Sequence, residues 1–293
     1  MQDPARTFEQ FRTRLQGIAY RMLGSVAEAE DVVQDAWLRW HDASRDEIDN
    51  IEAWLVSVAT RLSIDRLRAA KRQREHYQGI WLPEPVLSTP PTTPEEAVEQ
   101  ADNVSMAYLM LLERLAPEAR AAFLLREVFD EDYDQIAQIL NKSQAACRQL
   151  VSRAKTQLRD GQARFTVDQE THRHLLSGFV QTLASGDLSA ISALLAEEAM
   201  LIGDGGGRVA SFPEPLRGGP RIAQLFYASQ LRFKSDLRMQ IVHLNGRWAL
   251  LRFIQGQIES AMELESDGKR IFCVYVQRNP DKLQHIANTH SLA

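Results

Sequence analysis

The stretch DQIAQILNKSQAACRQLVSRAKTQLR, residues 134–159, determines how the middle of this chain folds. Apolar residues recur three and four positions apart on both sides of a short polar segment at residues 141–143, and this spacing predicts two amphipathic helices joined by a tight turn. The residues expected to pack across the turn are Ile136, Ala137, Leu140, Cys147, Leu150, Val151 and Ala154. Ser143 is placed to cap the second helix, so the stretch predicts a helix-turn-helix.

The second of these helices has a polar face suited to DNA. Arg148, Gln149, Ser152, Arg153 and Lys155 lie away from the apolar residues, and no acidic residue occurs between residues 141 and 159. Arginine and glutamine bond base edges in a major groove, and lysine contacts phosphates. The alternative is an ordinary solvated helix, because helix-turn-helix patterns taken alone give many false matches.

The composition excludes several classes of protein. With 293 residues, 44% of them hydrophobic and 25% charged, the chain is globular and long enough for two or three domains. Its net charge of −5 disfavours DNA binding by bulk electrostatics, so any DNA contact must come from local basic patches. The start has no secretion signal, no apolar run could span a membrane, and the two cysteines form no metal or disulfide pattern. We expect a cytoplasmic protein with no membrane contact.

The N-terminal part has its own helical block. Apolar periodicity predicts one helix ending at Gly24, a second that begins with the capping box of Ser25 and Glu28, and a third over residues 51–74. On the second helix, Asp31, Gln34 and Asp35 lie opposite an apolar stripe. The third helix ends in a basic run.

This block, FEQFRTRLQGIAYRMLGSVAEAEDVVQDAWLRW (residues 8–40) followed by AWLVSVATRLSIDRLRAAKRQR (residues 53–74), resembles region 2 of the sigma-70 family, of the extracytoplasmic-function (ECF) type. The resemblance implies that Asp31, Gln34 and Asp35 bind the clamp helices of the RNA polymerase β′ subunit. It also implies that the third helix melts and reads the −10 element. The side chains available there for phosphates are Arg61, Arg66, Arg68 and Lys71.

The helix-turn-helix and the preceding LERLAPEARAAFLLREV, residues 112–128, resemble region 4 of the same family. In that family the second helix of the motif reads the −35 element, which assigns the polar face described above to promoter DNA. The two blocks stand in the family's order and cover about residues 8–160. The implied partners are core RNA polymerase, including its β subunit, and promoter DNA.

The last third of the chain changes character. A helix is expected over residues 171–184, followed by alternating strands at residues 237–244, 248–258 and 271–278. This order resembles a SnoaL-like domain, the cone-shaped α+β barrel of the nuclear-transport-factor-2-like superfamily. WLPEP (residues 81–85), DGGGR (204–208) and NPDKL (279–283) resemble the signature of the SigJ-type group of ECF sigma factors, which carry such a domain as a fused extension.

The resemblance implicates these three motifs in regulatory contact between the extension and the sigma regions. The residues concerned are Trp81, Leu82, Pro83, Asp204, Gly205, Gly206, Gly207, Arg208, Asn279, Pro280, Asp281, Lys282 and Leu283. DGGGR lacks the spacing of a nucleotide-binding loop, and predicts a backbone that takes unusual φ or approaches another surface closely. For NPDKL, an ordinary terminal strand is the alternative.

Enzymes occur in the SnoaL-like superfamily, and a cyclase or isomerase would need a buried acid–base pair in the cone. The polar or aromatic candidates for the cone are Asp204, Tyr227, His243, Trp248 and Tyr275. His243 alternates in phase with apolar residues, and a lone histidine in that position is more often part of the core than a base. We expect no enzyme, cofactor or metal site, and leave open a small ligand of the SnoaL-like domain.

The expected architecture is multidomain: an all-α region 2 bundle (residues 1–75), a Pro-rich linker with the start of the next helix (76–103), an all-α region 4 helix-turn-helix (104–161) and an α+β SnoaL-like barrel (165–293). The expected function is that of an ECF sigma factor that initiates transcription and is controlled in cis by its extension. The alternatives are a small-molecule enzyme or sensor, and a one-component helix-turn-helix repressor.

Overall fold

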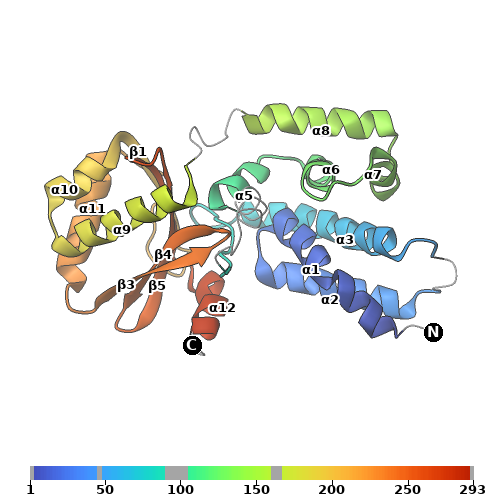
Figure 1. Ribbon diagram of the computed structural model, residues 1–293, viewed down its shortest axis with the longest axis horizontal. Coiled ribbons are helices and arrows are strands. Elements are labelled where there is room, and N and C mark those ends of the chain that lie inside the picture. Colours follow the sequence, from blue (N-terminus) through green and yellow to red (C-terminus); the bar gives the residue numbers. More distant parts are fainter. Residues whose placement is uncertain (1–2, 45–47, 90–104, 160–166, 291–293) are drawn as a thin grey trace. The chain divides into compact units, whose positions relative to one another are not determined.

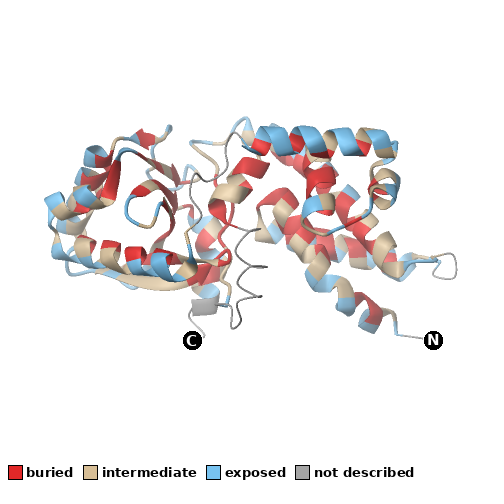
Figure 2. Ribbon diagram, turned by 45° about the horizontal axis from the view of Figure 1, so that its top comes forward, coloured by how far each residue is buried: buried red, intermediate tan, exposed pale blue. Residues whose placement is uncertain are grey.

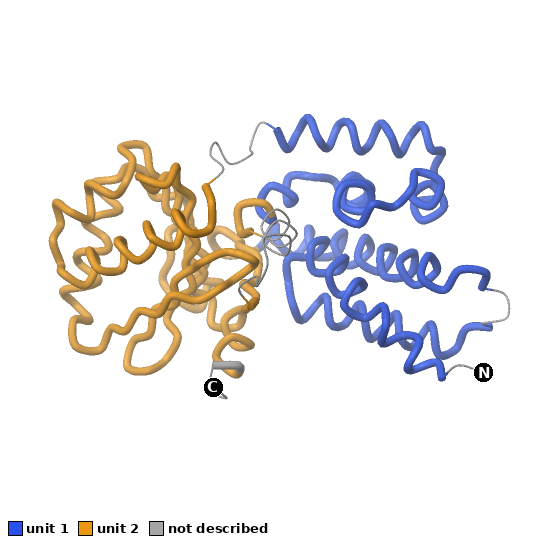
Figure 3. The backbone as a smooth tube through the Cα atoms, viewed as in Figure 1, with its two compact units in different colours: residues 1–76, 109–162 blue, residues 77–108, 163–293 orange. Residues whose placement is uncertain are grey.

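A computed structural model describes residues 3–44, 48–89, 105–159 and 167–290. The chain divides into two compact units, each discontinuous in sequence, which Figure 3 colours separately. The first comprises residues 1–76 and 109–162, and the second comprises residues 77–108 and 163–293. The linker after residue 76 therefore groups with the C-terminal residues. The expected helix start within residues 90–104 lies outside the described part of the chain.

The first half of unit 1 is a bundle of α1 (Pro4–Leu23), α2 (Val26–Asp42) and α3 (Ile51–Arg74) (Figure 1). Local signals set its boundaries. Gly24 takes a left-handed conformation with φ of 68° and ends α1, and the Ser25 hydroxyl accepts a hydrogen bond from the Glu28 amide at the start of α2. The predicted N-cap at Ser25 and the helix limits are therefore confirmed for this block.

The second half of unit 1 is also helical. It contains α6 (Pro117–Glu127), α7 (Tyr133–Leu140) and α8 (Gln144–Arg159), preceded by the short α5 (Met106–Leu112). Asn141 ends α7 in a left-handed conformation, and the Ser143 hydroxyl accepts from the Ala146 amide at the start of α8. Ile136 is buried as predicted, but Ile139 is buried in place of the half-buried Ala137 and Leu140. The helix-turn-helix is confirmed.

Unit 2 is built on a six-stranded sheet in the order β2-β1-β6-β5-β4-β3. Its strands are β1 (Leu195–Asp204), β2 (Leu216–Arg217), β3 (Leu237–Leu244), β4 (Arg247–Ile254), β5 (Gln257–Ser266) and β6 (Ile271–Gln277). Its helices are α9 (Gln169–Ser185), α10 (Leu188–Leu194), α11 (Gly219–Phe233) and α12 (Pro280–His290).

The two faces of this sheet are covered differently. Leu250 and Met262 belong to a core shared with α9, α10 and α11, whereas the neighbouring Leu251 and Ala261 belong to a second core that α12 completes with Ile286. Figure 2 shows buried residues in the strands of the sheet and in the helices of this unit. Two all-α blocks are therefore followed by a unit that combines helices with one sheet, which confirms the predicted α+β class for this part of the chain.

Two details of the strand pattern differ from the prediction. Residues 248–258 do not form one strand, because Gln255 and Gly256 take positive φ values of 52° and 80° and turn the chain from β4 into β5. NPDKL is neither a loop nor a terminal strand, since Pro280 begins α12. Proline is favoured at a first helical position, where its missing N–H is not needed.

Among the described helices, none combines the length and apolar character required to cross a membrane.

Candidate functional site

The polar side of α2 is the first candidate surface. Asp31 and Gln34 are exposed and Asp35 is half-buried, while Val32, Val33 and Ala36 on the other side are buried. Leu38, which the sequence analysis did not single out, is 52% exposed. It lies four residues after Gln34 and therefore on the same side of the helix. The structure thus brings the three predicted side chains together and adds an apolar residue beside them.

The four basic residues predicted for α3 all have protein partners within unit 1. Arg66 donates to Asp31 at 3.0 Å and to Asp35 at 2.7 Å, so it joins the polar face of α2. Arg61 donates at 2.9 Å to the main-chain oxygens of Gln138 and Ile139, at the end of α7. Cations at the end of a helix bond carbonyls that have no partner in the helix itself.

Arg68 and Lys71 contact the segment around the start of α6. Arg68 donates to Glu118 at 2.8 Å, and Lys71 donates to the main-chain oxygen of Leu115 at 2.7 Å. Burial lowers the pKa of Lys71, and the nearby Arg120 adds to this effect. The basic end of α3 therefore contacts the second half of unit 1 through the side chains assigned to DNA.

A buried ion pair lies beside these contacts. The Arg120 guanidinium is almost fully buried and donates to Glu113 at 2.6 Å and to the Met22 carbonyl at 2.7 Å, while Arg74 also pairs with Glu113. Burial alone would raise the pKa of Glu113, but the two arginines outweigh it and the net pKa lies below its ordinary value. A charge pair of this kind fixes geometry, because losing one partner leaves the other buried and unpaired.

On α8, the predicted DNA-facing residues Arg148, Gln149, Ser152, Arg153 and Lys155 are all exposed. The Arg148 guanidinium lies over the Tyr133 ring at 5.1 Å and bonds Gln144 at 3.2 Å, and Lys155 pairs with Glu127 at 2.6 Å. Within the part of the chain that the structure describes, neither Arg148 nor Arg153 pairs with a carboxylate. These side chains are thus accessible from solvent, as a face that reads base edges must be.

In unit 2 the three short motifs meet around the carboxylate of Asp204, which is fully buried. It accepts hydrogen bonds from Tyr77 Oη at 2.7 Å, from the Leu82 amide at 2.9 Å and from Lys282 Nζ at 2.7 Å. The Gly206 amide donates to it at 2.9 Å. We call Asp204 with these donors the linker clasp, because it attaches residues 77–82 to the ends of β1 and α12.

WLPEP supplies the apolar part of the same contact. Leu82 is fully buried and Pro83 is also buried, whereas Trp81 is half-buried with the Lys282 ammonium 4.3 Å from its ring centre. Leu82 is therefore the more deeply enclosed of the two apolar side chains. Gln277 completes the site by donating to the carbonyl oxygens of Leu82 and Pro83.

The glycines of DGGGR are required by this packing. Gly206 has φ of 61°, and a Cβ atom at Gly206 would overlap the side-chain amide of Asn279. Gly207 has φ of 68° and lies against Gln78. These features confirm the predicted unusual φ and close approach. Arg208 extends to Asp281, 3.3 Å away and at the first turn of α12.

Further along, the linker is bound to the end of β3 through an isolated β-bridge and the hydrogen bonds beside it. The Val86 amide donates to Asn245 Oδ1 at 2.8 Å, the Asn245 amide donates to the Val86 carbonyl at 2.8 Å, and Leu87 forms a bridge with Leu244. The Ser88 hydroxyl lies 2.8 Å from His243 Nδ1. Burial lowers the pKa of His243, which favours its neutral form.

The candidate catalytic residues do not gather in one place. The cavity on the helix-covered side of the sheet is lined by none of Asp204, Tyr227, His243, Trp248 and Tyr275. Asp204 and His243 instead contact the linker. Tyr275 is buried, and burial followed by the charge of Cys273 raises its pKa. These five residues therefore form no acid–base pair directed at the cavity.

Sequence reasoning missed Tyr77, Gln277 and Leu38. Tyr77 donates to Asp204 and accepts from Asn279 at 3.0 Å, and burial followed by the Asp204 hydrogen bond raises its pKa. No local pattern marks Tyr77, because its partners lie more than one hundred residues away. The signal that could have led to Tyr77 was the neighbouring motif WLPEP. For Leu38 it was AEDVVQDAWLRW, the stretch that contains it.

Comparison with known proteins matches both helical blocks of this chain to families of sigma factors. Residues 7–73 match the Sigma-70 region 2 family and residues 105–158 match the Sigma-70, region 4 family. The ECF RNA polymerase sigma factor SigJ of Mycobacterium tuberculosis is 36% identical over 243 residues, which are 82% of this chain and 78% of that protein. The probable ECF sigma factor SigI of the same organism is 34% identical over 63% of this chain and 64% of its own.

The similarity extends to three dimensions. The crystal structure of the Mycobacterium tuberculosis ECF sigma factor SigJ superposes with a TM-score of 0.75 at 30% identity. The match covers 96% of this chain and 98% of that one, so it includes the C-terminal unit as well as the two helical blocks.

Replacing Gly206 with alanine should loosen the linker clasp. The added Cβ atom overlaps Asn279, and the positive φ costs about 1 kcal/mol in addition. Gly186→Ala is the matched control, because Gly186 also takes a positive φ, of 68°, but has open space around it. Amide hydrogen exchange of residues 77–89, followed by mass spectrometry, should be faster in Gly206→Ala than in Gly186→Ala. Equal exchange in the two variants would contradict the assigned role of the glycine.

Proposed function

This chain belongs to the extracytoplasmic-function family of RNA polymerase sigma factors, and we propose the division of labour among its surfaces that follows. The α2 face binds core polymerase, α8 and the basic side of α3 bind promoter DNA, and the linker clasp lets the SnoaL-like unit control both in cis. The observation that carries the proposal is the meeting of WLPEP, DGGGR and NPDKL around Asp204. The chain acts in the cytoplasm, where core polymerase is found.

For core polymerase, the α2 face supplies both charge and an apolar contact. Asp31, Gln34 and Asp35 form the polar part that meets the β′ clamp helices, and the exposed Leu38 adds apolar area beside it. Interfaces of this type combine an apolar centre with a charged rim that steers association. Arg66 holds the two aspartates in place and can move to a phosphate once polymerase occupies them.

For promoter DNA, α8 enters the major groove of the −35 element. Arg148 and Gln149 are the base readers, with Ser152 and Arg153 on the next turn, and Lys155 contacts a phosphate. At the −10 element, Arg61, Arg68 and Lys71 exchange their present contacts with residues 115–139 for phosphates. Such exchange requires the two halves of unit 1 to separate, so this arrangement is the state before promoter binding.

For regulation, the linker clasp sets the path of the chain between the two sigma regions. A tethered domain acts at high effective concentration, so it needs no separate regulatory protein. The family is not generally enzymatic, and we propose that this chain is not an enzyme. Support comes from the five candidate catalytic residues, which do not line the cavity together.

Reversing the charges of the α2 face tests the polymerase contact. Asp31→Lys with Asp35→Lys should weaken binding to core polymerase about tenfold or more, because like charges then face the partner's basic side chains. Both ion pairs to Arg66 are substantially exposed, so the cost in stability should be small. Glu197→Lys with Glu198→Lys, on exposed positions of β1, is the control. Equal affinity for core in the two folded double variants would exclude the α2 face.

Removing single side chains from α8 tests promoter reading. Arg148→Ala should lower discrimination between −35 sequences by roughly 1–3 kcal/mol, whereas Lys155→Ala should weaken all sequences alike. Arg153→Ala should behave like Arg148→Ala. The measurement is run-off transcription with core polymerase on templates that differ only at the −35 element. If both arginine variants keep the wild-type preference, α8 is not the reader.

Weakening the linker clasp tests regulation in cis. Trp81→Ala removes the ring under Lys282, and truncation of such a contact costs about 2 kcal/mol when the residue is a hot spot. We expect Trp81→Ala and Gly206→Ala to change run-off output in the same direction without changing promoter choice, and Gly186→Ala to leave output unaltered. Equal run-off output from the wild-type chain and all three variants would show that the linker clasp has no regulatory role.

A further inference from the structure

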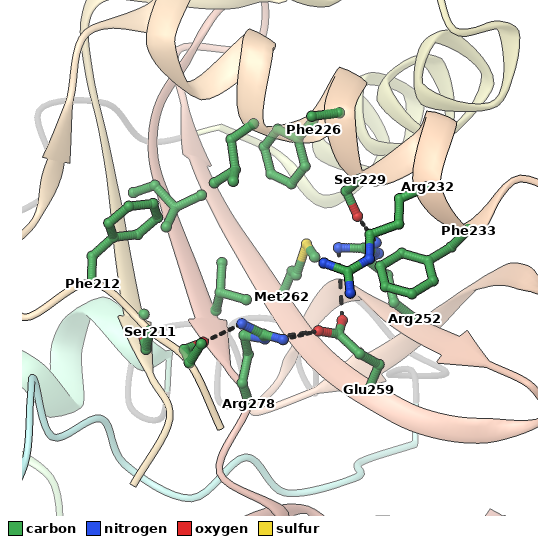
Figure 4. A pocket seen from close by; sticks show the side chains of 16 residues that line it. Ser211, Phe212, Phe226, Ser229, Arg232, Phe233, Arg252, Glu259, Met262 and Arg278 are labelled. Carbon is green, nitrogen blue, oxygen red and sulfur yellow. Dashed lines mark hydrogen bonds and ion pairs between the residues drawn. The ribbon is translucent and has the colours of Figure 1, made fainter. Parts of the chain in front are cut away.

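The cavity on the helix-covered side of the sheet in the SnoaL-like unit has two chemically different ends. Its volume is about 410 Å³, within the usual range for small-molecule sites. Phe212, Phe226 and Met262 stand on the apolar side in Figure 4, together with Leu201, Leu225 and Val276 in the lining. Arg232, Arg252 and Arg278 stand at the other side around the single carboxylate of Glu259.

The charges at the polar end do not balance. The lining contains three arginines and one glutamate and no other ionisable side chain of the lysine, aspartate or histidine type. Arg278 donates to Glu259 through Nε at 2.7 Å and pairs through a second nitrogen at 2.6 Å. Arg252 lies 3.7 Å from the same carboxylate and donates to the Ser229 hydroxyl at 2.6 Å. Glu259 can neutralise one of the three guanidinium groups, so the cavity keeps an excess of positive charge.

The arrangement is built into the backbone. Arg252 pairs with Ser260 and Phe253 pairs with Ile258, so Glu259 is an extra residue between them in the β5 strand. A β-bulge of this kind redirects a side chain, here toward the arginines. The Arg252 side chain is only 9% exposed. Burial lowers its pKa, and the opposing effect of Glu259 does not cancel this, so a further negative charge would stabilise the charged guanidinium.

We propose that this cavity binds a small organic anion, with an apolar aromatic or aliphatic body against Phe212, Phe226 and Met262 and a carboxylate-like group at Arg232 and Arg252. Arginine recognises carboxylates through paired, charge-assisted hydrogen bonds. Arg232 is exposed at the edge of the cavity and stacks on Phe233, so its guanidinium can reach an incoming anion. Arg252 then holds the anion inside the cavity.

The site lies directly next to the linker clasp. Gly203 and Arg278 line the cavity, and the adjoining Asp204 and Asn279 belong to the clasp, on the other side of the strand ends. The Arg278 amide donates to the Asp204 carbonyl at 2.8 Å, and its guanidinium also bonds the Ala210 carbonyl beyond DGGGR. An anion that draws the Arg278 guanidinium away from Ala210 would therefore act on a residue whose main chain is bonded to Asp204 of the clasp.

Matched pairs of probes test the proposal on the purified full-length chain. The anions 2-naphthoate and octanoate are compared with their neutral amides, 2-naphthamide and octanamide, by isothermal titration calorimetry. We expect at least one anion to bind about tenfold or more tightly than its amide, since only the anion can accept charge-assisted hydrogen bonds. Equal affinity within both pairs, or no binding by either anion, would overturn the proposal.

Two arginine variants on the same helix locate the site. Arg232→Gln should weaken the anion about tenfold and leave the amide unchanged, and Arg221→Gln, an exposed α11 residue outside the lining, should change neither. Loss of binding in both variants, or in neither, would place the anion elsewhere and overturn the assignment. The titrations contain no polymerase or DNA, so a negative result is distinct from failure of the proposed sigma function.

Discussion

The carboxylate of Asp204 is fully enclosed, and a buried charge is tolerated only while donors surround it. Those donors come from Tyr77 and Leu82 in the linker, from the glycine loop and from Lys282. Residues that are far apart in sequence must therefore be in place together. Detaching the linker would leave this carboxylate without two of its hydrogen-bond donors, which costs free energy. The linker therefore belongs to the C-terminal unit and is not a free tether.

In unit 1, basic side chains proposed to contact DNA already have partners in the protein. Arg61 and Lys71 bond carbonyl oxygens, and Arg68 bonds Glu118, in the half of the unit that carries the helix-turn-helix. Residues suited to phosphates are equally suited to carboxylates and to helix ends, because all three present oxygen acceptors. Under the proposed function, promoter DNA and the second half of unit 1 compete for one set of cations.

Sequence was sufficient where structure is decided locally. The limits of α1, α2 and α3 follow from Gly24, Ser25 and the apolar periodicity, since caps and helix faces involve residues within about four positions of one another. Prediction from the sequence failed at the β4–β5 turn, because Gln255 gives no strong turn signal. It also failed at Glu259, because the direction of that side chain depends on the register of β5 with the neighbouring strand. The three motifs indicated that their segments matter, but their meeting at Asp204 depends on pairing between β1 and β6.

The distance along the chain between the clasp residues has a consequence for synthesis. The ribosome completes α8 at Arg159 and then adds roughly 120 residues before Lys282 exists. At about 5–20 residues per second this takes roughly 6 to 25 s, whereas helices and short loops form in microseconds. During that interval both helical blocks of the nascent chain are present while the acceptor site for the linker is still incomplete. Each newly made molecule thus passes through a period in which its linker has not yet been captured.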